Sequence, residues 1–200
     1  MLKELICRYP ELENCRNDII LARESIIQCY KDGGKLLLCG NGGSSADCDH
    51  IVGELMKGFR EKRRVTDERI PYHLREKLQG SLPAISLSSQ SAALTAFIND
   101  EDPSMVYAQL LYGYARPEDL FVGLSTSGNS DNVVNAATAA KALGLKTVAL
   151  TGNDSSILSD LCDITIRVPE TETYKVQELH LPIYHYLCAS VEKHFFGSHT

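Results

Sequence analysis

The chain has 200 residues, 44% of them hydrophobic, and carries 20 Lys and Arg against 26 Asp and Glu. This size and composition are typical of one globular domain with its own core. The net charge of −6 argues against non-specific nucleic-acid binding, which needs a basic face. No apolar run approaches the roughly 18 residues of a membrane helix, so we expect neither nucleic acid nor membrane as a partner.

The seven cysteines are odd in number and none forms a C-x-x-C pair. No stretch before Cys7 has the apolar length of a signal peptide. We therefore expect a reducing, cytoplasmic location, with most cysteines packed as small hydrophobic residues. A four-thiolate zinc site is not favoured, because paired spacing is missing.

Helix and strand patterns alternate along the chain. An N-terminal helical segment is predicted over residues 1–34, where Asp32-Gly33-Gly34 ends the helical spacing. Further helices are predicted at Ser44–Phe59, Ser91–Ile98, Ser104–Tyr114, Asn132–Leu143, near Ile157 and at Val176–Phe195. Short apolar runs predict strands at Leu36–Cys39, Ala84–Leu87, Leu120–Leu124, Thr147–Leu150 and Ile164–Val168. This alternation predicts an α/β fold with helices on both faces of a parallel sheet.

Residues 60–81 interrupt the alternation with a charged insertion that includes Lys62-Arg63-Arg64 and Arg69. Its composition favours a surface excursion, with a short helix at Tyr72–Gln79. We interpret the whole chain, 1–200, as a single domain carrying this insertion.

Two loops rich in serine and glycine follow the first and third predicted strands, Cys39–Ser45 and Ser125–Ser130. Ligands of parallel sheets bind beyond the carboxyl ends of the strands. Glycine lets backbone N–H groups approach an anion, hydroxyls donate to phosphate oxygens, and the following helix adds its positive end. The loops predict a phosphate site, although two ordinary turns with Ser and Asn caps are the simpler alternative. Neither loop has the spacing of a nucleotide-binding motif.

Two helices carry polar residues at helical spacing. His50 and Glu54 lie four residues apart and share one face of the helix that leaves the first loop. On the last helix, a second stripe contains Gln177, Leu181, Tyr184 or His185, and Cys188. The set His50, Glu54, Gln177 and His185 could hold zinc, or it could move protons in an aldose–ketose isomerisation. A solvated His/Glu pair and a buried structural histidine are the plainer interpretations, and spacing leaves the choice open.

Three motifs, LLLCGNGGSSADCDHIVGE, LSTSGNSDNV and VQELHLPIYH, resemble those of SIS-domain phosphoheptose isomerases in order and spacing. The resemblance extends over nearly the whole chain. It implies a flavodoxin-like three-layer sandwich with a five-stranded parallel sheet, assembled as a homotetramer. It also implies conversion of sedoheptulose 7-phosphate to D-glycero-D-manno-heptose 7-phosphate.

The resemblance assigns roles residue by residue. Glu54 and His185 correspond to the base and the acid, and zinc in some members is bound by residues matching His50, Glu54, Gln177 and His185. The residues expected to bind substrate are Asn41, Gly42, Gly43, Ser44, Asp100, Ser125, Thr126, Ser127, Ser130 and Gln177.

Two other functions stay open. Many of these isomerases have arginine where this chain has Gly58, and an acidic residue at the position of Tyr174, which leaves room for another sugar phosphate as substrate. A non-catalytic relative in the same superfamily resembles the isomerases in its loops but lacks the carboxylate and the histidine. Because Glu54 and His185 are present here, the isomerase is favoured over such an adaptor.

Overall fold

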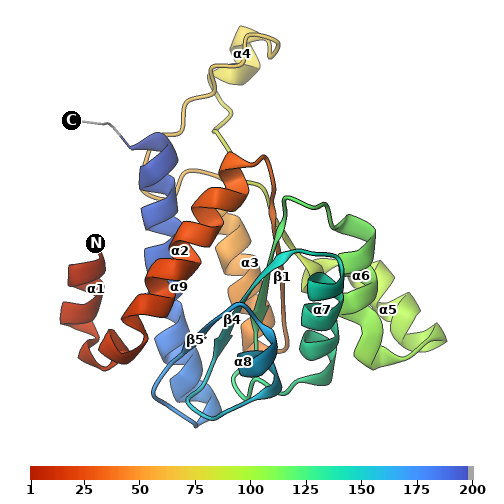
Figure 1. Cartoon of the computed structure of the whole chain (residues 1–200). Helices are drawn as coiled ribbons and strands as arrows, with labels where there is room; N and C mark the ends of the chain where they lie inside the picture. The colour runs from red at the N-terminus through yellow and green to blue at the C-terminus, as the bar shows by residue number, and fades with distance from the viewer. Residues whose placement is uncertain (198–200) are drawn as a thin grey trace.

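A computed structural model describes residues 1–197 of the protein (Figure 1). A five-stranded parallel sheet forms the centre of the molecule. Its strands are β1 (Leu36–Gly40), β2 (Ala84–Ser86), β3 (Leu120–Leu124), β4 (Lys146–Thr151) and β5 (Ile164–Arg167). They lie in the order β2-β1-β3-β4-β5, and every neighbouring pair is parallel. All five predicted strands are confirmed. The apolar runs of β1 and β3 are buried on both faces, whereas the edge strands β2 and β5 alternate between buried and partly buried residues.

Helices cover both faces of the sheet, so the predicted three-layer sandwich is confirmed. The helices are α1 (Leu2–Arg8), α2 (Arg16–Lys31), α3 (Gly43–Met56), α4 (Tyr72–Arg75), α5 (Ser91–Asp100), α6 (Val106–Tyr114), α7 (Asp131–Ala142), α8 (Ile157–Leu161) and α9 (Thr173–Phe196). Short 3₁₀ turns stand at Pro10–Cys15, Leu87–Ser89 and Pro103–Met105.

Alternate side chains of β1 enter two separate cores. Leu36 and Leu38 pack in the core under α2, α3 and α9, whereas Leu37 and Cys39 pack in the core under α6 and α7. This period of two follows from the pleat of a strand. It fixes α3 and α9 on the same face of the sheet, where they contact each other.

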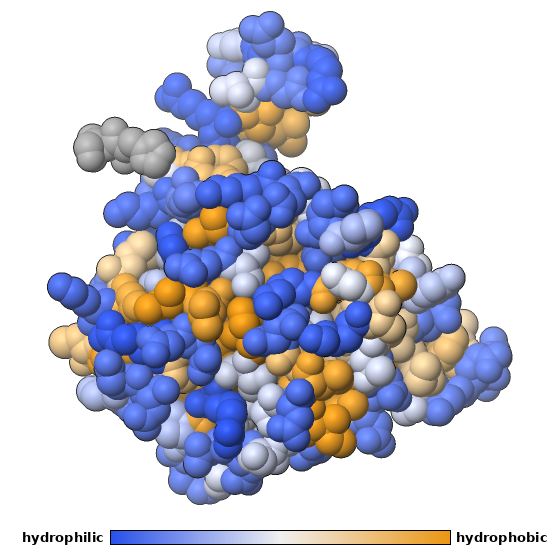
Figure 2. Space-filling view, viewed as in Figure 1, coloured by the Kyte–Doolittle hydropathy of each residue, from blue (hydrophilic) through white to orange (hydrophobic). Residues whose placement is uncertain are grey.

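The insertion differs in part from its prediction. It projects from the body as an arm tipped by α4 and covered mainly by hydrophilic residues, and α4 ends at Arg75 rather than Gln79 (Figures 1 and 2). The prediction of a surface excursion is wrong at the root of the arm, where Arg63 is only 1% exposed. A guanidinium can be buried there because Glu192 of α9 pairs with it.

The chain order reverses between β1 and β3, which lie next to each other although β2 separates them in sequence. Both serine–glycine loops leave the carboxyl ends of these two strands, at the switch point where open α/β sheets bind ligands. All seven cysteines are free thiols, and five of them are buried. Within residues 1–197, no helix combines the length and the apolar character that a membrane span requires.

Candidate active site

The first loop turns sharply from β1 into α3. Gly42 adopts φ +55°, a left-handed conformation that side chains disfavour, and the N–H groups of Ser45 and Ala46 then bond to its carbonyl. Ser44 is 3% exposed and belongs to the first turn of α3. The loop therefore presents backbone N–H groups and the positive end of a helix at the sheet edge.

The second loop joins β3 to α7 and has the same character. Gly128 adopts φ +66°, and a Cβ there would lie 2.1 Å from the Ser156 Oγ, so the position requires glycine. The hydroxyls of Ser125 and Ser130 lie 3.0 Å apart, and the Ser125 residue is 3% exposed. Thr126 and Ser127 stand between them and are more open to solvent.

The two loops are joined by amide side chains. Asn41 donates to the Asn132 Oδ1 at 2.8 Å, and Asn132 donates back to the Asn41 Oδ1 at 2.9 Å. The Tyr107 hydroxyl donates to the Gly40 carbonyl at 2.9 Å and also reaches Asn41. Sequence reasoning missed Asn132 and Tyr107; the position of Asn132, at the start of the helix after the second loop, was the available signal.

A carboxylate lies between two imidazoles further along α3. The Glu54 Oε1 is 3.1 Å from the His50 Nε2 and 3.4 Å from the His185 Nε2 of α9. Glu54 is buried, whereas His50 and His185 are partly open, so the cluster faces solvent through its histidines. The structure thus brings together the two helices that the sequence stripes singled out.

The Tyr184 side chain of α9 contacts the His50 ring of this cluster and orients it. Its hydroxyl donates to the Asp47 Oδ1 at 3.0 Å and lies 3.1 Å from the His50 Nδ1. Since the other imidazole nitrogen of His50 faces Glu54, both nitrogens of that ring are engaged. Sequence reasoning gave no role to Asp47, although it stands three residues before His50 on the same helical face.

The environment shifts the pKa values of both ends of the Glu54–His185 pair toward each other. Burial raises the pKa of Glu54, and the neighbouring His50 offsets part of that rise. Burial also lowers the pKa of His185, with further lowering from His50 and Arg8. A carboxylate made more basic beside a less basic imidazole is a suitable pair for transferring protons.

Two other predicted residues lie elsewhere. The Gln177 amide packs against the first loop, where a Cβ on Gly43 would lie 2.5 Å from its Nε2. Asp100 ends α5 as an exposed residue whose carboxylate accepts from Asn99 at 2.9 Å. Among the described residues, no hydrogen bond or ion pair joins Asp100 to either loop.

A cavity of about 490 Å³ opens beside His185. It lies between α1, α9 and the segment after α3, and its cationic lining comes from Arg8 and Arg60. The ring of Phe59 also lines it, with its centroid 6.0 Å from that of His185. The proton-transfer cluster is therefore adjacent to a space large enough for part of a small polar ligand.

The cluster also suits a divalent metal ion. One ligand atom from each of His50, Glu54 and His185 lies within 4.8 Å of the others. The second carboxylate oxygen of Glu54, Oε2, is buried without a hydrogen-bond partner. Two imidazoles and a carboxylate are a ligand set typical of zinc with an open coordination position.

The five-stranded parallel sheet with helices on both faces is the fold of a known family of domains. The family model described as SIS domain matches residues 8–152, most of the chain, so the chain belongs to the SIS-domain family.

Comparison with individual proteins shows to which group within the family the chain belongs. The chain is 40% identical to a phosphoheptose isomerase of Nitratiruptor over 92% of its own length and 89% of the relative. The solved phosphoheptose isomerase of Neisseria gonorrhoeae superimposes with a TM-score of 0.78 at 31% identity, covering 96% of this chain and 94% of that one. That of Francisella tularensis gives 0.75 at 29% identity, over 88% and 86%. Within the SIS-domain family, this chain is a member of the phosphoheptose isomerases.

Proposed function

We propose that this protein is an aldose–ketose isomerase that converts sedoheptulose 7-phosphate to D-glycero-D-manno-heptose 7-phosphate. The observation that carries the proposal is the Glu54 carboxylate between His50 and His185, on a helix that begins in a phosphate-binding loop. Membership of the phosphoheptose isomerases gives independent support.

The substrate phosphate is held between the two loops. Backbone N–H groups at Gly42 and Gly43, the Ser44 hydroxyl and the hydroxyl groups of the second loop surround the sheet edge, where α3 and α7 both begin. The hydroxyl groups of the second loop belong to Ser125, Thr126, Ser127 and Ser130. Hydrogen bonds to a charged group are stronger than those between neutral groups, so this site binds a phosphate dianion without a lysine.

The distance along α3 favours a long sugar. At 1.5 Å per residue, Ser44 and Glu54 are about 15 Å apart along the helix axis. In a 7-phosphate the reacting carbons, C1 and C2, are at the opposite end of the chain from the phosphate. An extended seven-carbon substrate therefore covers more of the distance between the phosphate site and the Glu54 carboxylate than a shorter one.

The residues of the cluster carry out the two proton transfers of the isomerisation. Glu54 takes a proton from C1 of the ketose, which gives an enediol, and the carboxylic acid formed returns the proton to C2. His185 moves the second proton between the oxygens on C1 and C2. The raised pKa of Glu54 makes it a stronger base for a carbon-bound proton.

Zinc would be held by His50, Glu54 and His185, whose ligand atoms are already close together. When bound, zinc supplies Lewis-acid polarisation of the substrate carbonyl. Gln177 was predicted both as a fourth ligand and as a substrate contact, and the packing of its amide on Gly43 supports the substrate contact between the loop and the cluster.

We also propose a homotetramer in the cytoplasm. Helix α5 has no buried residue although it is mostly apolar, and large apolar side chains of α5 and of the segment leading through α6 stay exposed. These are Ile98, Met105 and Tyr112. An exposed apolar face of this kind is suited to contact with further copies of this chain. Asp100, at the end of α5, would then lie where it can reach the active site of a neighbouring copy.

The proposal is tested by incubating the purified protein with sedoheptulose 7-phosphate, with and without added zinc, and following product by NMR. We expect turnover by the wild type and its loss in Glu54→Gln and His185→Ala. Glu178→Gln, an exposed carboxylate on α9, is the control expected to retain full activity.

Three results would contradict the proposal in different ways. No turnover of this substrate but turnover of a hexose or pentose phosphate would change the substrate. Tight binding without turnover of any sugar phosphate would favour an adaptor or sensor. Full activity in both site variants would contradict the roles of Glu54 and His185.

A further inference from the structure

Helix α3 ends without a cap of its own. Its last residue is Met56, and Lys57 continues in an extended conformation with φ −141°. The final carbonyls of a helix have no partner within the helix and need one from outside. Glu54 stands in this last turn, so whatever satisfies these carbonyls also fixes the backbone of the proposed base.

The root of the arm supplies those partners. The Arg63 guanidinium donates to the Glu54 carbonyl at 2.9 Å and to the Leu55 carbonyl. From the other end of the insertion, Ser81 donates its hydroxyl to the Met56 carbonyl at 2.8 Å. A positive charge at a helix C-terminus is also favoured by the helix dipole.

Glu192 of α9 completes the arrangement. Its Oε1 accepts from the Arg63 Nε at 2.8 Å, and both side chains are fully buried. The same carboxylate accepts the backbone N–H groups of Phe59 and Arg60, each at 2.7 Å. These hydrogen bonds and Arg63 outweigh the effect of burial and lower the pKa of Glu192, so it stays ionised.

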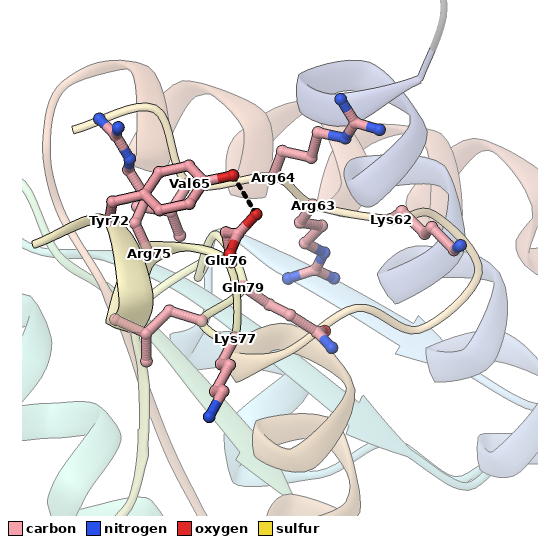
Figure 3. Close-up of a pocket in the computed structure, with 10 residues that line it drawn as sticks. Lys62, Arg63, Arg64, Val65, Tyr72, Arg75, Glu76, Lys77 and Gln79 are labelled. Carbon is pink, nitrogen blue, oxygen red and sulfur yellow. Dashed lines mark hydrogen bonds between the residues drawn. The ribbon is translucent and has the colours of Figure 1, made fainter. Parts of the chain in front are cut away.

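The pair therefore connects both sides of the site. Arg63 holds the backbone of Glu54, while Glu192 holds the turn whose Phe59 ring lies beside His185. Figure 3 shows Arg63 directed into the body of the protein, whereas Arg64 on the next position points outward. The root of the arm belongs to the site structurally, although the rest of the arm stands away from it.

We propose that the buried Arg63–Glu192 pair is a positioning device for Glu54, which holds the last turn of α3 so that the carboxylate meets the reacting carbon. This inference rests on the proposed isomerase function. Arg63 is a positioning residue, because its contacts are to the backbone of the base. Lysine cannot replace it, since one ammonium group cannot reproduce the planar fork that donates to two carbonyls and to Glu192 at once.

The test compares Arg63→Lys and Glu192→Gln with Asp119→Asn. Asp119 is a matched control because it is also a buried carboxylate that accepts backbone N–H groups, from Lys35 and Arg116, and forms an ion pair. It lies at the opposite ends of β1 and β3, away from the site. All three variants are expected to lose thermal stability.

Only Arg63→Lys and Glu192→Gln, the variants at the root of the arm, should lose catalytic activity. We expect kcat per folded protein to fall about tenfold to a hundredfold, as displacement of a reacting group by an ångström produces, while KM stays within about twofold. Hydrogen exchange at the amides of the last turn of α3 and of Phe59 and Arg60 should become at least about tenfold faster relative to the Asp119 variant.

Unchanged kcat and unchanged exchange in Arg63→Lys would overturn the inference. Equal kcat loss in Asp119→Asn at an equal loss of stability would also overturn it, since the effect would then be general. If the wild type shows no turnover, the proposed function fails, and hydrogen exchange alone decides whether the pair holds the last turn of α3.

Discussion

The two ends of α3 do different work with different chemical groups. At the N-terminal end, Gly42 and Gly43 offer backbone N–H groups and Ser44 offers its hydroxyl, and these donors are positioned as soon as the chain folds. At the C-terminal end, Glu54 meets side chains from α9, and its properties depend on burial and on neighbouring imidazoles. Holding an anion requires fixed dipoles, whereas moving a proton requires a group that can gain and lose one.

This difference separates binding from catalysis along one helix. Changes at the N-terminal end should act on KM, because the phosphate is bound equally in the ground state and the transition state. Changes at the C-terminal end should act on kcat.

Glu54→Gln should have the largest effect. Removing the proposed base should lower kcat by about 10²- to 10⁴-fold, the range typical of general acid–base groups, and leave KM within a few-fold. Initial rates by NMR over a range of substrate concentrations measure both constants. A rise in KM with unchanged kcat would break the division between the two ends.

His180 lies outside both ends of α3, and changing it should affect stability rather than KM or kcat. It is fully buried against the Thr151 carbonyl, and burial lowers its pKa to about 4. Because the unfolded chain binds this proton near pH 6.5, stability should fall as the pH drops from 6.5 toward 4, by about 2 kcal/mol between pH 7.5 and pH 5.

Urea unfolding of the wild type and of His180→Gln at both pH values measures this contribution. The variant should lack that part of the pH dependence, while kcat at pH 7.5 stays near wild type. An identical pH dependence in the two proteins would mean that His180 is not held neutral in the folded state.

Ser125→Ala should raise KM about tenfold, the loss expected for one hydrogen bond to a charged group, and change kcat less than about twofold. Ser190→Ala is the control, since this serine is equally buried but donates within α9, to Leu187. Isothermal titration with inorganic phosphate should give the same ranking. A kcat loss without a KM change would place Ser125 in the chemistry instead.

Gly43→Ala should have the smallest effect. The added methyl would push the Gln177 amide aside, and we expect KM to change only a few-fold, because that side chain can rotate. Gly53→Ala on the same helix is the control: nothing lies within 4 Å of its added Cβ. Alanine there should raise stability by about 0.5–1 kcal/mol and leave KM unchanged.

Local patterns in the sequence predicted most of the fold. The strands, both loops and the approach of His50 to Glu54 depend on residues within one element or on the turn that follows it, and periodicity reports such relations. The meeting of α3 with α9 was predicted through the family resemblance and through the polar stripes on both helices.

Contacts between distant segments were not predictable in this way. The amide pair of Asn41 and Asn132 and the pair of Arg63 and Glu192 join residues far apart in sequence. No spacing rule connects them, and a charged insertion ordinarily implies solvent exposure. Asp100, expected in the sugar site by resemblance alone, stays a prediction.

The arm is closed at its base. Arg64 pairs with Gln79 in an antiparallel bridge, and the Gly80 N–H donates to the Arg63 carbonyl at 2.8 Å. The chain between these points starts and finishes at the same place whatever its length, and each doubling of a flexible loop costs only about 0.6 kcal/mol. We therefore expect the length of this excursion to change at little cost in free energy, and a reporter domain inserted into it to leave the last turn of α3 in place.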